Sequence, residues 1–171
     1  DVEVTGIALK SEGREEPLEP GRVADPGAGE YVRLGDMLRA RGRNAAAGVE
    51  YDKAFAINPK NPSVASRQAL GMLWRKDYEK ALEAVSGVID IYEDRTVLWM
   101  RKGEALMGLG RFGEASAAFG EIMEINPFDE PARMALYEAY KKAGNSQRAE
   151  EELKNLKIIS GAGGKNPHDG H

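Results

Sequence analysis

Apolar residues recur along the chain in pairs of amphipathic stretches, each about 12–14 residues long and bounded by turn residues. One pair ends at Ile57-Asn58-Pro59 and a later pair ends at Ile125-Asn126-Pro127, with the two prolines 68 positions apart. A residue that precedes proline is disfavoured in helical backbone, so both Asn-Pro pairs indicate helix ends. The pattern predicts helix–turn–helix units with a period of 34, half of that interval.

A step of one period keeps side chains of similar size in register. A small residue of each first helix recurs as Gly35, Ala69, Gly103 and, as a departure, Tyr137. Large residues recur as Leu38, Met72, Leu106 and Tyr140, and as Tyr51, Val85, Phe119 and Leu153. The register predicts four copies without insertion, over 28–61, 62–95, 96–129 and 130–163, flanked by an acidic segment, 1–27, and a tail, 164–171.

Turn and cap signals fall at the boundaries that this register requires. Asn61 precedes Pro62 in the arrangement of an N-cap and first helical residue. We expect the same capping from Asp77 and Asn145, which stand before second helices. First helices should end at glycines, namely Gly42, Gly110 and Gly144.

One helix pair cannot bury its apolar face alone, so the copies must stack against one another. The third copy carries Trp99, Gly103, Leu106, Gly110, Ala115, Phe119, Ile122 and Pro127 at the pattern's aromatic, small, large, turn and proline positions. This pattern resembles the tetratricopeptide repeat, although that family favours a small residue in place of Ile122. The resemblance implies an all-α, right-handed superhelical solenoid of four helix–turn–helix repeats.

The second and fourth copies match this family less well. Ala65 and Arg133 stand at the first aromatic position, Glu93 stands where proline is usual, and Tyr137 occupies the small position. We expect these two copies to be the least regular, with looser helix packing in the fourth.

The resemblance also implies that the first helices line a concave groove, through the second, fifth, ninth and twelfth residues of each copy. We therefore predict a peptide-binding groove with apolar anchors, acidic spots and basic ends. Its residues are Val32, Asp36, Arg39, Ser66, Leu70, Leu73, Trp74, Val97, Met100, Glu104, Met107, Met134, Glu138 and Lys141. The alternative for several apolar members is burial between repeats.

One subclass of this family grips the C-terminal carboxylate of chaperone peptides with Lys, Arg and Asn side chains. Here the corresponding places hold Val32, Asp36, Ser66, Leu70 and Met100, which argues against that role. The predicted partner is instead an extended or helical segment with apolar anchors and basic residues that meet the groove acids. The convex side should carry polar residues of second helices, a kind of surface that rarely makes binding hot spots; these residues are Glu50, Lys53, Glu83, Glu121 and Lys154.

Composition excludes several other classes of function. The chain has 24 Lys and Arg against 28 Asp and Glu, a net charge of −4, which argues against a nucleic-acid partner. It has no cysteine, no signal peptide and no apolar run of the length that a membrane span needs. We expect a soluble chain with no membrane insertion, and the compartment stays open.

Catalytic groups are scarce. The two histidines, His168 and His171, both lie in the glycine-rich tail, where we interpret them as solvated rather than as metal ligands. The stretch Gly161–Lys165 lacks the spacing and the Ser or Thr of a phosphate-binding loop. The sequence therefore predicts no enzyme, no cofactor and no metal site.

Two functional hypotheses remain. The first is a protein-interaction scaffold or adaptor; the second is the regulatory or assembly arm of a larger enzyme whose catalytic domain lies before residue 1. The first residue, Asp1, and the strand-like stretch Val2–Leu9 motivate the second hypothesis. The same stretch is a candidate occupant of the groove.

The end of the last repeat lacks a capping helix in this interpretation, because Gly161–His171 is rich in glycine and expected to be mobile. The apolar side formed by Tyr137, Tyr140, Leu156 and Ile159 would then be exposed. A homodimer through this uncapped repeat, or docking of the N-terminal segment, would cover it.

Overall fold

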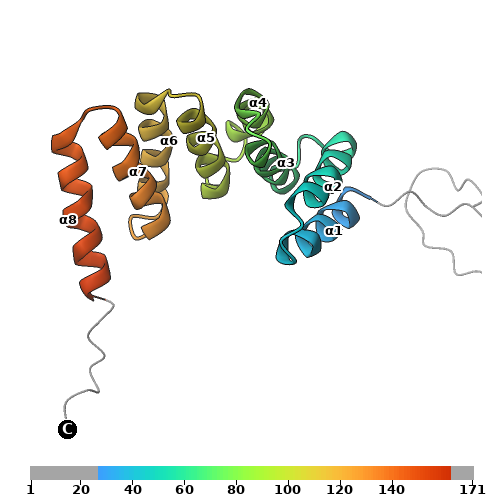
Figure 1. The fold of residues 1–171 in the computed structure, drawn as a ribbon, viewed down its shortest axis with the longest axis horizontal. Coiled ribbons are helices and arrows are strands. Elements are labelled where there is room, and N and C mark those ends of the chain that lie inside the picture. The colour runs from blue at the N-terminus through green and yellow to red at the C-terminus, as the bar shows by residue number, and fades with distance from the viewer. Residues whose placement is uncertain (1–26, 163–171) are drawn as a thin grey trace, which may run out of the picture.

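The computed structural model describes residues 27–162, which form eight α-helices and no strand (Figure 1). The first helices are α1 (Ala28–Ala40), α3 (Pro62–Trp74), α5 (Thr96–Gly108) and α7 (Glu130–Lys142). The second helices are α2 (Asn44–Ile57), α4 (Tyr78–Ile89), α6 (Phe112–Ile125) and α8 (Ser146–Ala162). Within each series every helix starts 34 positions after the one before it, so the predicted period is confirmed.

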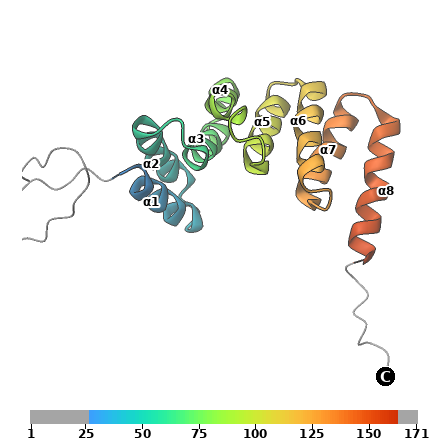
Figure 2. The same ribbon diagram turned by 180° about the vertical axis from the view of Figure 1, so that it is seen from behind.

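The helices stack side by side into an arch, with α1 at one end and α8 at the other (Figures 1 and 2). Each helix packs against its neighbours in sequence, and α3 packs also against α1 and α5. Two clusters of buried residues form the core, one around Val85, Ile89 and Leu98 and one around Phe119 and Ile122. The fold is the all-α superhelical solenoid that the sequence predicts.

Close contact between a glycine and a ring sets the spacing of the two helices in the first and third repeats. Tyr51 and Phe119 are almost wholly buried, at 0% and 1% exposed. A Cβ atom placed on Gly35 would fall within 2.7 Å of two Tyr51 ring atoms, and one on Gly103 within 2.6 Å of three Phe119 ring atoms. Any larger side chain at either glycine would have to push the helices apart.

The turns between paired helices follow one backbone pattern. Gly42, Gly110 and Gly144 adopt φ angles of 72°, 73° and 75°, as the sequence predicts for residues that follow a helix. The second repeat has Lys76 at the same place, with φ 61°. Left-handed backbone costs a non-glycine residue roughly 1–2 kcal/mol, so this turn is strained relative to the other three.

The predicted caps are formed at two of three sites. The Asn61 side chain accepts hydrogen bonds from the backbone N–H of Ser63 and Val64, and Asn145 accepts one from Arg148. The capping prediction for Asp77 is wrong, because its carboxylate binds the Lys80 ammonium at 2.8 Å and makes no cap hydrogen bond. A charged partner within one helical turn has displaced the backbone donor.

The second and fourth repeats replace family features by polar contacts. Glu93 stands in place of proline, and its carbonyl accepts a hydrogen bond of 2.8 Å from the Trp99 indole. Arg133, at the position of an aromatic residue, is only 9% exposed. It binds the Glu152 carboxylate at 2.5 Å and donates to the Pro127 carbonyl at 2.6 Å.

The final helix corrects two expectations for the C-terminal end. It runs to Ala162, so Gly161 belongs to the helix and not to a mobile tail. Leu156 is buried at 6% exposed, because it packs inward, and Tyr137, Tyr140 and Ile159 are half-buried. The predictions for residues 1–26 and 163–171, including both histidines, lie outside the described residues.

We predict that Gly103→Ala lowers the free energy of unfolding by about 1–3 kcal/mol, because the new methyl group meets the buried Phe119 ring. Gly120→Ala is the matched control, since it also lies inside a helix but a Cβ there meets nothing within 4 Å. It should raise stability by about 0.5–1 kcal/mol through helix propensity. Urea titration of both variants measures the free energy of unfolding. A change in the same direction for both variants, relative to the parent, would contradict the prediction.

Candidate functional site

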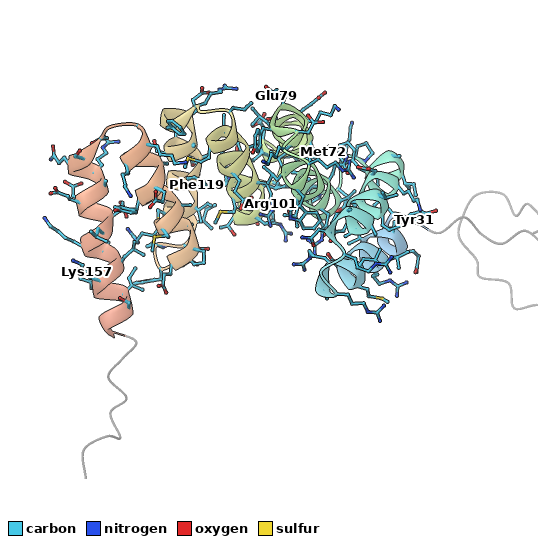
Figure 3. All side chains as sticks on the ribbon, in the orientation of Figure 1. Tyr31, Met72, Glu79, Arg101, Phe119 and Lys157 are labelled. Carbon is cyan, nitrogen blue, oxygen red and sulfur yellow. The ribbon has the colours of Figure 1, made fainter. Side chains whose placement is uncertain are left out.

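A recess opens on the inner side of the arch, where three first helices come together. We call it the groove recess; it holds about 90 Å³ and is lined by Asp36, Arg39, Ser66, Arg67, Leu70, Val97 and Arg101. These residues come from α1, α3 and α5. Figure 3 shows Arg101 toward the inside of the arch and Glu79 on its outer edge. The recess is therefore a place where a ligand could contact three repeats at once.

Five predicted groove residues line this recess, namely Asp36, Arg39, Ser66, Leu70 and Val97. Sequence reasoning missed Arg67 and Arg101, which each follow a predicted position by one residue. Both stand at the sixth place of their repeats, one full period apart, and this recurrence was the available signal. The recess has a buried floor and an exposed rim, because Ser66 is 2% exposed whereas Val97 is 38% exposed.

The apolar members of the prediction divide between groove and core. Leu73 packs against the cluster around Val85, and Met100 and Met107 pack against the cluster around Phe119. The Trp74 ring lies tilted against Tyr51, with centroids 6.2 Å apart. These side chains are half-buried and support the helix stack, and none of them lines the groove recess.

The remaining predicted residues lie apart from the groove recess. Val32 lines a separate hollow near the start of α1, together with Ile57 and Asn61. On α7, Met134 is 47% exposed, and Glu138 and Lys141 form an ion pair of 3.7 Å with each other. No α7 residue lines the groove recess.

Asp36 is the centre of the polar contacts in the recess. Its carboxylate accepts hydrogen bonds from the Tyr51 hydroxyl at 2.7 Å and the Arg67 guanidinium at 3.0 Å, and Arg39 lies 3.7 Å away. Burial raises the pKa of Asp36, but the hydrogen bonds from Arg67 and Tyr51 outweigh burial and hold the pKa below its usual value. Burial, and then the hydrogen bond to Asp36, raise the pKa of Tyr51 to about 12.

The groove acids are already paired within the chain. Glu104 accepts a hydrogen bond of 2.6 Å from Arg101, so it too has an arginine partner. The recess itself is lined by three guanidinium groups and one carboxylate. The Nε atoms of Arg67 and Arg101 are buried and have no hydrogen-bond partner among the described residues. The lining of this recess carries excess positive charge, which favours acidic rather than basic partner residues at this place.

The outer side of the arch is also not uniformly polar, contrary to expectation. A hollow of about 440 Å³ between α2, α3 and α4 is lined by Phe55, Met72 and Ala84 among others. Gln68 borders it, and the buried Oε1 atom of this side chain has no hydrogen-bond partner in the described part of the chain. An equivalent hollow of about 490 Å³ lies one repeat further on, and there Lys102 stands at the position of Gln68.

Two further findings concern the described residues alone. Within residues 27–162, no helix combines the length and the hydropathy needed to cross a membrane. No three His, Asp or Glu side chains of that range gather closely enough to hold a metal ion.

Residues 97–129 match the profile of the tetratricopeptide repeat family. A curated relative is the DnaJ homolog subfamily C member 3 of Rattus norvegicus, 28% identical over 105 residues, which are 61% of this chain but 21% of that protein. The chain thus spans about a fifth of this relative.

Solved structures of similar fold include TTC0263, a thermophilic repeat protein of Thermus thermophilus, with 23% identity, a TM-score of 0.69, and coverage of 78% of this chain and 74% of that one. A crystal structure of MamA aligns with a TM-score of 0.74 at 17% identity, over 84% of both chains. A MamA from Desulfovibrio magneticus RS-1 aligns at 0.73 with 16% identity, over 81% of this chain and 78% of that one. Likeness at these identities concerns the fold alone.

We predict that Tyr51→Phe lowers the free energy of unfolding by about 1–2 kcal/mol at pH 7, because Asp36 loses a hydrogen bond while the ring still fills its site. The raised pKa of Tyr51 stabilises the fold fully below the unfolded pKa of about 10, and this contribution is lost as pH rises through the folded value. The difference between parent and variant should therefore shrink above pH ~10. Chemical denaturation across alkaline pH measures it, and a constant difference would contradict the assignment.

Proposed function

Because this chain is a tetratricopeptide-repeat protein, whose fold serves as a protein-interaction scaffold, we propose that it holds a peptide or helix of a partner protein in its concave groove. The observation that carries the proposal is the groove recess, where α1, α3 and α5 each contribute polar and apolar side chains. A segment bound there would touch three repeats, and its position would depend on the spacing of the helices. The site for binding is thus built by the stack rather than by one element.

The lining residues indicate the chemistry of the partner. Leu70 and Val97 offer apolar surface, so the partner should insert an aliphatic or aromatic side chain. Arg67 and Arg101 each retain a buried N–H without a hydrogen-bond partner in the described residues. A carboxylate of the partner would pair with the exposed part of these guanidinium groups, whose side chains are 30% and 20% exposed, and would balance the excess positive charge. The partner segment therefore combines an apolar anchor with a nearby acidic residue.

The second hypothesis, an arm of a larger enzyme, finds indirect support in one comparison. The matched stretch makes up 21% of the curated relative, so repeats of this kind occur within much longer chains. The groove proposal holds in either setting, since it concerns the repeats themselves.

We predict that Leu70→Glu weakens binding of a captured and identified partner segment by at least about tenfold, because a charge replaces apolar contact in the recess. Val49→Glu is the control, since Val49 is an exposed apolar residue, at 48%, on the second helix α2 and outside the recess. Calorimetric titration of purified segment and protein compares them, after circular dichroism shows both folded. Unchanged affinity for Leu70→Glu would remove the groove assignment.

We further predict that Arg101→Gln weakens binding of an acidic segment about 10-fold and makes its affinity less sensitive to salt. Lys102→Gln removes the same charge from the adjacent residue of α5, which lines the outer hollow, and should have little effect. A segment whose acidic residue is changed to its amide should bind parent and Arg101→Gln equally. Equal losses from both variants would show only a general effect of charge.

A further inference from the structure

The first helix presents an apolar face to the outside of the arch, away from the rest of the solenoid. We call it the α1 outward face; its apolar residues Tyr31, Leu34 and Met37 line a hollow of about 470 Å³ together with Glu30 and Arg33. Leu34 is 42% exposed and Met37 is 52% exposed. Figure 3 places Tyr31 at this end of the molecule. The Lys53 side chain of α2 lies over the Tyr31 ring, whereas Leu34 and Met37 remain exposed.

Equivalent positions in the later repeats show that this face of a first helix can pack against a neighbouring helix. Tyr31, Leu34 and Met37 correspond, one period later, to Ala65, Gln68 and Gly71. All three of these are buried in α3. In the later repeats Ala105 and Ala139 occupy the position of Met37, and both are 0% exposed. Thus α1 leaves exposed a face that α3 buries, and that α5 and α7 bury at the position of Met37.

The size of Met37 restricts what could cover this face. A Cβ placed on Gly71 would lie in tight contact, 3.3 Å from the Gly48 Cα, and the later repeats carry nothing larger than the methyl groups of Ala105 and Ala139 at this position. A methionine cannot fit under a helix at that distance. The second helix of another repeat, including one from a second copy of this chain, therefore cannot stack on α1 as α2 stacks on α3. An extended segment is thinner than a helix and avoids this clash.

The chain itself contains such a segment. In Val2–Leu9 a strand-like pattern breaks at Gly6, with Val2 and Val4 before it and Ile7 and Leu9 after it, so one of the two apolar pairs can face α1 at a time. The 17 residues between Leu9 and Gly27 can span roughly 50 Å or more, whereas Met37 lies only about 15 Å along the helix from Gly27. The intervening residues are therefore long enough for Val2–Leu9 to reach the α1 outward face.

Charge favours the same match. Residues 1–26 contain seven acidic and three basic residues. Near the α1 outward face, Arg33 forms an ion pair with Glu30, and the Lys53 ammonium, 5.5 Å from the Tyr31 ring centroid, pairs with Glu50, whereas Arg41 at the end of α1 is exposed. Opposite charges at the rim of an apolar contact would fix the orientation of the bound segment.

We propose that Val2–Leu9 of the same chain docks on the α1 outward face and caps the first repeat. The groove residues Asp36 and Arg39 belong to the same helix, so the cap would also steady one wall of the groove recess. The proposal is independent of the partner proposed above, since it concerns another face of α1.

The chain has no cysteine, so introduced cysteine pairs test the docking directly. Ile7→Cys combined with Met37→Cys should form an intrachain disulfide about tenfold faster than Ile7→Cys combined with Ile57→Cys. Ile57 is the matched control because it is also 52% exposed and lines a hollow with Ala28 and Gly29 at the start of α1. A freely moving tether would favour Ile57 or show no preference, and either result overturns the proposal. Disulfide-linked dimers through Met37→Cys would overturn it in favour of a second copy.

A second measurement separates docking from chance proximity. Ile7→Asp with Leu9→Asp should lower the thermal midpoint of the parent and speed amide hydrogen exchange in α1. In a Met37→Asp variant the apolar surface of the α1 outward face is already disrupted. Adding Ile7→Asp with Leu9→Asp to this variant should then change neither the thermal midpoint nor the exchange rate in α1. Equal effects in both backgrounds, or none in the parent, would show that the segment does not bind this face.

Discussion

The structure depends on one steric constraint, the fit of a small residue of the first helix against a larger residue of the second helix in the first three repeats. The pairs are Gly35 with Tyr51 and Gly103 with Phe119, and the second repeat places Ala69 and the smaller Val85 in one buried cluster. A glycine under a ring lets two helices approach closely, and that spacing sets how much apolar surface every neighbouring helix can bury. Tyr51 also reaches past the core, since its hydroxyl holds Asp36 at the groove. The same side chain therefore fixes the helix spacing and orients a carboxylate of the candidate site.

This constraint explains why the fold could be predicted from the sequence. Side-chain size must recur at a fixed interval for the stack to continue, so the period of 34 is visible in residues such as Gly35 and Gly103 and it gives the start of every helix. Turn glycines were predictable for a similar reason, because left-handed backbone favours glycine. Local competition was not predictable: Asp77 binds Lys80 instead of the backbone, and α8 continues through Gly161.

The candidate site was predicted in part, and the missing part has a physical cause. Helical periodicity identifies which backbone positions face inward, and it correctly brings Asp36, Leu70 and Val97 to one recess. It does not say where a long, flexible side chain ends, so Arg67 and Arg101 were missed at positions one residue away. Their presence reverses the sign of the local charge although the chain as a whole carries −4. Pairing inside the fold, rather than the count of acids and bases, decides which charge a partner meets.

The two ends of the solenoid differ in a way that bears on how it stops. At the last second helix, Lys157 stands where the equivalent Phe55, Ile89 and Met123 pack against or within the core, and it lies exposed on α8 (Figure 3). A charge at this position keeps a further repeat from stacking, because its ammonium would lose water without gaining a partner. At the first helix Met37 blocks stacking by size instead, and it leaves apolar surface behind. One end thus presents a solvated charge, whereas the other presents the exposed apolar side chains of Leu34 and Met37.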